Sequence, residues 1–102
     1  MNKLWEAIDV INERGWIQGS MENDHGVCLL GAYRRACGLQ PNQSWDGFLN
    51  SPAEVELDLL DETALEQYGA LGFVAFNDQL GTTKDDVITL LEKAAIKKDE
   101  LV

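Results

Sequence analysis

The two side chains best suited to covalent chemistry are a cysteine and a histidine that lie close together in the first third of the chain. Cys28 is expected in the first turn of a helix, where the helix dipole and the exposed amide groups favour a thiolate. His25 lies just before it, and Asn77 or Asp78 could orient the imidazole. One interpretation is therefore a thiol-dependent hydrolase or transferase. It ranks second, because a free cysteine in a helical core is the more common case.

The same residues do not predict a metal site. Zinc needs about four ligands. His25 and Cys28 have a suitable spacing, but Cys37 lies about 13 Å further along the same expected helix. That distance also excludes a disulfide between the two cysteines, since the bridged Cα atoms must lie within about 7 Å. We predict two free thiols, which are typical of a reducing cytoplasm, with no metal and no cofactor.

The charge of the chain is concentrated in its middle. The net charge is −10, and residues 36–83 hold eight acids and no Lys or Arg, whereas residues 1–35 and 84–102 each hold five acids and four bases. A chain without a basic patch is not expected to bind nucleic acid directly. A solvated helix face is the ordinary interpretation of such acids. The more specific interpretation is a surface that attracts a basic partner.

This second interpretation leads to the main functional prediction, a non-catalytic protein-binding module that acts through an acidic face over residues 51–68. Acids at positions 54, 58 and 62 would lie about 6 Å apart along one side of a helix. The partner would be a host or cellular protein with a basic surface. The residues predicted to contact it are Glu54, Asp58, Asp61, Glu62 and Trp45.

Asn77 and Asp78 have two interpretations of their own. Both residue types tolerate turn conformations and bond to neighbouring backbone amides, so a structural turn is favoured. The alternative is an exposed recognition loop. A third functional hypothesis is a homo-oligomer whose interface contains Trp45 or Phe48.

The elements that must position these residues are helices. Apolar residues at helical spacing predict helices over residues 2–14 and 27–37, one or two helices over 51–68, and a last helix that begins after Thr83. A surface helix needs an apolar arc of roughly 100°. In the 27–37 segment the apolar side chains cover about twice that arc, so we expect this helix to be central. Asn23 or Asp24 would cap its start.

Together these elements predict an all-α fold, a compact bundle of four to five helices around the 27–37 helix, in a single domain over residues 1–102. The apolar segment 73–76 is ambiguous between a helix end and a short extended segment. No apolar run approaches the roughly 20 residues that cross a membrane. The first residues carry acids within their apolar pattern and do not read as a signal peptide, so we expect a cytoplasmic protein.

Several short blocks of the chain resemble a small family of unknown function that occurs in actinobacteria and their bacteriophages. The blocks follow the family's order and span most of the chain, and the acidic stretch at 51–68 matches least. The resemblance implies a compact cytosolic domain, encoded by a phage or its host, and implies no activity. The blocks are Gly15-Trp16-Ile17-Gln18-Gly19, Cys28-Leu29-Leu30-Gly31-Ala32 with Ala36, Phe76-Asn77-Asp78, Thr83-Lys84-Asp85-Asp86-Val87 and Leu90-Leu91.

Overall fold

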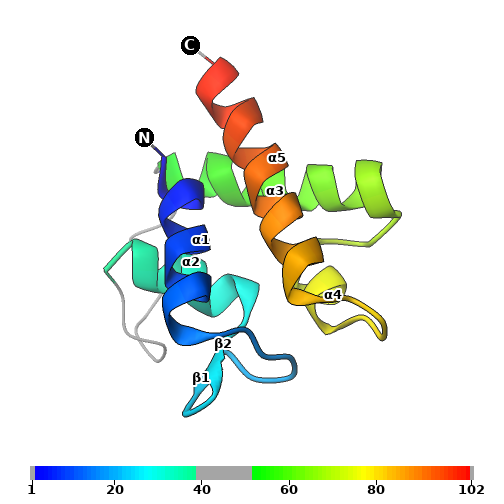
Figure 1. The fold of residues 1–102 in the computed structure, drawn as a ribbon. Coiled ribbons are helices and arrows are strands. Elements are labelled where there is room, and N and C mark those ends of the chain that lie inside the picture. Colours follow the sequence, from blue (N-terminus) through cyan, green and yellow to red (C-terminus); the bar gives the residue numbers. More distant parts are fainter. Residues whose placement is uncertain (1, 39–51, 102) are drawn as a thin grey trace.

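The computed structural model describes residues 2–38 and 52–101, in which five helices and one short hairpin are arranged around a common core (Figure 1). The elements in chain order are α1 (Lys3–Arg14), β1 (Glu22–Asn23), β2 (Gly26–Val27), α2 (Leu29–Ala36), α3 (Pro52–Tyr68), α4 (Phe73–Asp78) and α5 (Lys84–Glu100). The prediction of a helical bundle is confirmed, with a two-residue antiparallel pairing of β1 and β2 as its only sheet among the described residues.

The first helix has an apolar face and two well-defined ends. Its buried residues recur at helical spacing and are Leu4, Ala7, Ile8 and Ile11. Asn2 caps the start, since its Oδ1 accepts a hydrogen bond of 3.0 Å from the Leu4 amide. Gly15 ends the helix at φ 93°, a conformation that strains other residues. α1 packs against α2, α5, α3 and β2, whereas α2 packs against α1, α4 and β2. The predicted central position is therefore shared with α1.

The second helix is shorter than predicted. Residues 22–27 form the β1–β2 hairpin, so α2 begins only at Leu29. Its N-cap is Cys28, whose Sγ accepts a hydrogen bond from the Gly31 amide at 3.3 Å, and the prediction of Asn23 or Asp24 as the cap is wrong. The hairpin escaped the sequence analysis because two-residue strands have too few positions to show an alternating pattern.

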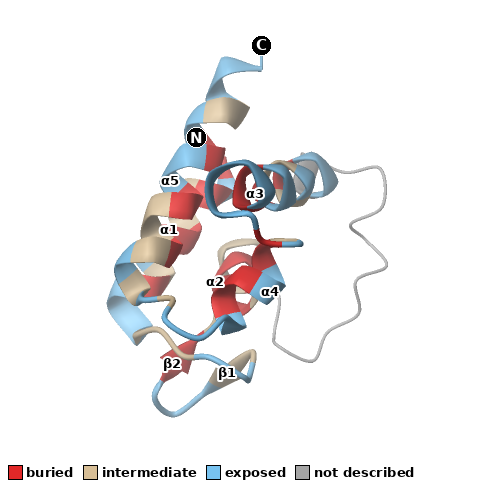
Figure 2. Cartoon of the chain, turned by 90° about the vertical axis from the view of Figure 1, so that its right-hand side faces the viewer, coloured by how far each residue is buried: buried red, intermediate tan, exposed pale blue. Residues whose placement is uncertain are grey.

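The third helix is one continuous element, which settles whether residues 51–68 hold one helix or two. Leu60, Thr63 and Ala64 are fully buried on its inner side. Figure 2 shows the opposite side of α3 exposed along its length.

The segment that follows is a helix, so the alternative of an extended segment near residues 73–76 is wrong. Phe73 and Phe76 are both buried in α4. A strand would direct side chains three residues apart to opposite faces, whereas a helical turn places them on one face. The ring of Tyr68 stacks on Phe76 with centroids 4.4 Å apart. Burial of both phenylalanines therefore favours the helix.

The last helix begins after Thr83, as predicted, and its first turn forms a capping box. The Thr83 hydroxyl accepts from the Asp86 amide, and the Asp86 carboxylate accepts from the Thr83 amide. α5 then packs against α1 and α3 through Val87, Leu90, Leu91, Ala94 and Ala95. These residues belong to one apolar core that contains α1, α2, α3 and α4 as well.

Candidate functional site

Asn77 is a buried junction between segments that are far apart in the sequence. Its Oδ1 accepts hydrogen bonds from the indole of Trp16 at 2.7 Å and from the Leu29 amide at 3.0 Å. Its Nδ2 donates to the Ile17 carbonyl at 3.3 Å and to Asp78 at 2.9 Å. We call these five residues the Asn77 network. The side chain is only 2% exposed, so the prediction of an exposed recognition loop is wrong for Asn77.

Asp78 is exposed but has a structural task too. Its Oδ1 accepts from the Gly19 backbone amide at 3.0 Å, and the side-chain Nε2 of the adjacent Gln18 donates to the carbonyls of Asn77 and Gln79. The loop after α1 is thereby attached to the end of α4. Three of the blocks that carried the family resemblance meet here.

A small pocket of about 160 Å³ lies beside this junction. Cys28 and Asp78 line it, and the other lining residues are Gly19, Ser20, Met21, Leu30, Val74 and Asn77. Burial raises the pKa of the Cys28 thiol, Asp78 raises it further, and the Gly31 amide opposes them in part. The helix terminus therefore does not produce the thiolate expected from the sequence, because desolvation outweighs it.

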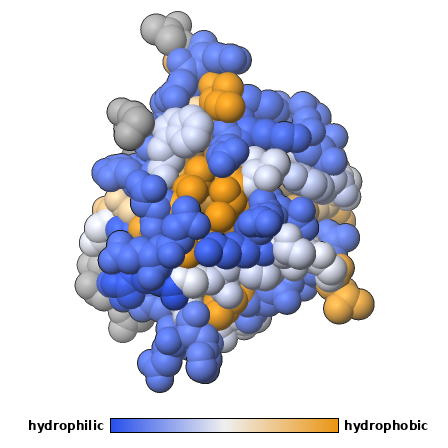
Figure 3. Space-filling model, in the orientation of Figure 1, coloured by the Kyte–Doolittle hydropathy of each residue, from blue (hydrophilic) through white to orange (hydrophobic). Residues whose placement is uncertain are grey.

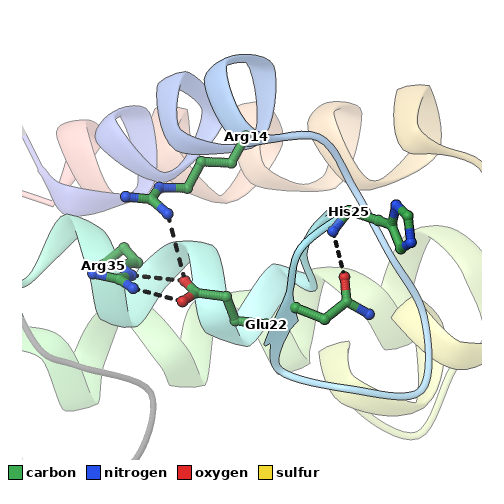
Figure 4. A network of polar contacts seen from close by, with 5 residues as sticks. Arg14, Glu22, His25 and Arg35 are labelled. Carbon is green, nitrogen blue, oxygen red and sulfur yellow. Dashed lines mark hydrogen bonds and ion pairs between the residues drawn. The ribbon is translucent and has the colours of Figure 1, made fainter.

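His25 is not part of the pocket. It lies in the turn of the hairpin, where its backbone amide donates to the side chain of Asn23 at 2.7 Å. Its ring is exposed and points away from the neighbouring ion pairs (Figure 4). Within the described part of the chain, no hydrogen bond joins this ring to Cys28 or Asp78. The pocket therefore brings together Cys28 and Asp78 but not the third residue of the proposed catalytic set, His25.

The hairpin carries an ion-pair network that the sequence analysis missed. Glu22 accepts two hydrogen bonds from the Arg35 guanidinium, at 2.7 and 2.5 Å, and lies 3.9 Å from Arg14 (Figure 4). The Arg35 hydrogen bonds lower the pKa of Glu22. The network attaches β1 to the ends of α1 and α2. Nothing in the sequence pattern signalled it, since the pairing depends on the hairpin.

Glu56 is the one acid of α3 that is buried, with 4% of its surface exposed. Its Oε1 accepts from the Tyr33 hydroxyl at 3.0 Å and from the Lys3 amide at 3.1 Å. Burial raises the pKa of the Tyr33 phenol far above its ordinary value. The position of Glu56 was predictable, because it lies four and seven residues before the buried Leu60 and Thr63.

The side of α3 that faces away from the core combines acids with apolar residues. We call it the outward face of α3, and it consists of Glu54, Val55, Asp58, Asp61, Glu62, Leu65 and Glu66. Val55 is 44% exposed and Leu65 is 56% exposed. Among the described residues, Asp58 and Glu62 form no hydrogen bond or ion pair, whereas Glu66 pairs with Lys97 at 3.1 Å. Trp45, which was predicted to join this surface, lies outside the described residues.

Asp61 differs from its neighbours because it holds the start of α4. Its Oδ1 accepts from the Phe73 amide at 2.9 Å. Next to it, a pocket of about 350 Å³ is lined by Asp61, Glu62, Leu65, Ala70, Leu71 and Gly72, and we call this the corner pocket. Asp61 and Glu62 were predicted from the sequence as binding residues, whereas Leu65 and Leu71 were not.

Among the described residues, no group of three or more His, Cys, Asp or Glu side chains could hold a metal ion. None of the helices in residues 2–38 and 52–101 combines the length and the apolar character needed to cross a membrane.

Comparison with known proteins supplies one match. No curated protein and no solved structure matches the chain. Residues 2–97 match the profile described as "Family of unknown function (DUF6197)", which covers nearly the whole sequence, including the Asn77 network and the outward face of α3. The chain belongs to this family of unknown function.

Proposed function

We propose that this protein is a non-catalytic binding module that uses the outward face of α3 to contact a protein with a basic surface. The observation that carries the proposal is the state of the acids on this face. Asp58 and Glu62 are one helical turn apart, exposed, and without an ion-pair partner among the described residues. No Lys, Arg or His occurs anywhere in α3 to neutralise them.

The rest of the surface explains why this face is preferred. Figure 3 shows a face of the molecule that is mostly hydrophilic, with apolar patches between the hydrophilic residues. Three bases of the described residues are used within the fold, since Lys97 pairs with Glu66, Lys93 donates to Gln67 and Arg35 pairs with Glu22. An unneutralised acidic surface attracts basic partners and raises their association rate.

The test compares two double variants of equal charge. Asp58→Asn with Glu62→Gln removes two acids from the outward face of α3. Asp9→Asn with Glu13→Gln removes the same two residue types, at the same spacing, from the exposed side of α1. Each protein is immobilised and exposed to an actinobacterial lysate at low and high salt, and the retained proteins are identified by mass spectrometry.

We expect a protein with a basic surface that is retained by the wild type and by the α1 variant and is released from the α3 variant. High salt should release it from the wild type and from the α1 variant as well, because exposed charges are screened beyond about 10 Å at 0.1 M and at still shorter distances in more salt. Equal retention by both variants, or no retention by the wild type, would contradict the proposal.

The resemblance noted in the sequence supports a more specific role. We infer that the protein is cytoplasmic and serves as an accessory factor of an actinobacterial phage that acts on a host protein. The acidic surface suits a partner that itself binds nucleic acid, because such partners present arrays of Lys and Arg.

A thiol-dependent activity is the second candidate, since Cys28 lines the 160 Å³ pocket together with Asp78. The raised pKa of this thiol argues against it. Iodoacetamide should therefore alkylate Cys28 more slowly near neutral pH than it alkylates free cysteine, and a Cys28→Ser variant identifies the labelled site. Alkylation faster than that of free cysteine would favour the enzyme.

A further inference from the structure

Leu71 is a large apolar residue that is almost fully exposed beside the outward face of α3. Its side chain is 92% exposed, although burying a leucine is worth about 1.5–3 kcal/mol. It lies in the connection between α3 and α4, where it lines the corner pocket with Leu65 and Ala70. Exposed apolar side chains beside a pocket are typical of a binding surface.

The connection that carries Leu71 is held in place on both sides. The Gly69 amide donates to the Leu65 carbonyl at 3.0 Å, and the buried Ala70 donates to the Ala64 carbonyl at 3.3 Å. On the other side, Asp61 accepts from the Phe73 amide. A Cβ at Gly72 would lie 3.1 Å from Asp61 Oδ1, at a φ of 129° that favours glycine. Leu71 is thus presented to solvent by a constrained turn, which lowers the entropy cost of binding.

The charges around the pocket decide which occupant fits. Asp61 and Glu62 form part of its lining, and Asp58 lies one turn away on the same helix. A second copy of this chain would bring these acids against their own equivalents, and like charges in contact are unfavourable. A partner that carries Lys or Arg on either side of a large apolar residue satisfies both the pocket and its acidic edge.

We propose that the corner pocket is the apolar anchor of the interface, and that it takes a large aliphatic or aromatic side chain from a basic amphipathic helix while Leu71 packs against the apolar side of that helix. This inference rests on the proposed function and specifies its partner. The acidic face alone would bind any basic surface, whereas the pocket selects a partner with an apolar side chain among its bases. Apolar anchors of this kind dominate the affinity of protein interfaces.

Two synthetic helical peptides test the anchor. One repeats Lys and Leu so that each residue type forms one side of the helix, and the other has Ala in place of every Leu. Their affinities for the wild type, Leu71→Ser and Leu80→Ser are measured by fluorescence anisotropy at low and high salt. Leu80 is the matched control, since it is 99% exposed but lies outside the corner pocket.

We expect the wild type and Leu80→Ser to bind the Lys/Leu peptide about tenfold more tightly than the Lys/Ala peptide, and Leu71→Ser to lose that preference. Amide signals of Leu65 to Gly72 should shift in the NMR spectrum when the Lys/Leu peptide binds. Salt-dependent binding of both peptides without a preference would overturn the anchor and leave the acidic contact standing. The absence of salt-dependent binding to either peptide would overturn both.

Self-association is the remaining outcome. Sedimentation at high salt, where the acids are screened, should show a monomer. A dimer that Leu71→Ser dissociates would assign the pocket to a second copy of the chain and overturn the proposal.

Discussion

The Asn77 network and the outward face of α3 use polar side chains in opposite ways. In the network, the side-chain oxygen and nitrogen of Asn77 each make two hydrogen bonds, to partners as distant in sequence as Trp16. On α3, the carboxylates of Asp58 and Glu62 remain exposed to solvent. The difference shows that a polar side chain suited to catalysis or recognition, such as Asn77, can have all its hydrogen bonds within the fold. Asp58 and Glu62 have no such partners among the described residues and stay exposed.

The substitution with the largest expected effect is Gly31→Ala, at a position beside the Asn77 network, two residues after Leu29. A Cβ at this position would lie 2.1 Å from the Met21 carbonyl oxygen, which belongs to the backbone and accepts a hydrogen bond from the Cys28 amide. We expect the free energy of unfolding to fall by about 4 kcal/mol or more, because a packed backbone cannot move far enough to relieve so close a contact. Urea denaturation measures the loss.

Gly19→Ala is the control for the glycine substitution. Its φ is 82° and no atom lies within 4 Å of the added Cβ, so it should cost only about 1 kcal/mol. Gly31 lies inside α2 and has no positive φ, so a loss for Gly31→Ala no larger than that for Gly19→Ala would contradict the contact with Met21.

Asn77→Ala should have the next largest effect. It removes the acceptor of the buried Leu29 amide and of the Trp16 indole, and a buried donor without a partner costs about 1–3 kcal/mol. We expect the free energy of unfolding, measured by urea denaturation, to fall by about 3 kcal/mol in total. The tryptophan emission wavelength should change as well, because the Trp16 indole loses its acceptor. A loss below about 0.5 kcal/mol would contradict the structural role of the network.

A smaller and pH-dependent effect is expected for Glu22→Gln. The pKa of Glu22 is lowered in the folded state, so its pairing with Arg35 stabilises the fold above pH 4.5, the ordinary pKa of the group. That stabilisation disappears as the pH falls through the lower pKa of the folded protein. The thermal midpoint of the variant should lie about 2 °C below that of the wild type at pH 7 and should meet it in acid. A difference that does not change with pH would contradict the ion pair.

The smallest effect on stability is expected on the outward face of α3. Leu65→Ala should change the free energy of unfolding by less than about 0.5 kcal/mol, because the side chain is more than half exposed. Leu60→Ala, on the buried side of the same helix, should cost about 3 kcal/mol. Chemical denaturation of the two variants measures the difference in stability between a substitution on the buried side of α3 and one on its exposed side. Similar losses would mean that Leu65 belongs to the core.

The helices could be predicted because their evidence is local. The spacing of Leu4, Ala7, Ile8 and Ile11 and the capping box of Thr83 and Asp86 are visible in the sequence, and both appear in the fold. The α4 helix was ambiguous, because four apolar residues fit a strand and a helix equally well. Its conformation follows from the burial of two phenylalanines against other elements, which is tertiary information.

The candidate site was less predictable than the fold. The exposed acids Asp58 and Glu62 follow from helical periodicity, and so does the burial of Glu56. The exposure of Leu71 could not be inferred, because a leucine within the apolar segment 69–76 is more often expected to be buried. The position of His25 outside the pocket of Cys28 was unpredictable for a related reason, since the hairpin that holds His25 has no sequence pattern of its own.

The hydrogen bond from the Leu29 amide to Asn77 also links the start of one helix to the end of another across 48 positions of the chain. This hydrogen bond forms only when both helix ends are in place, and its partners are far apart in sequence. We therefore expect α2 and α4 to form cooperatively and late in folding. In deuterium exchange, this amide should open only when the whole molecule unfolds, while amides at the hairpin turn exchange by local motion. One amide proton therefore reports the global free energy of unfolding.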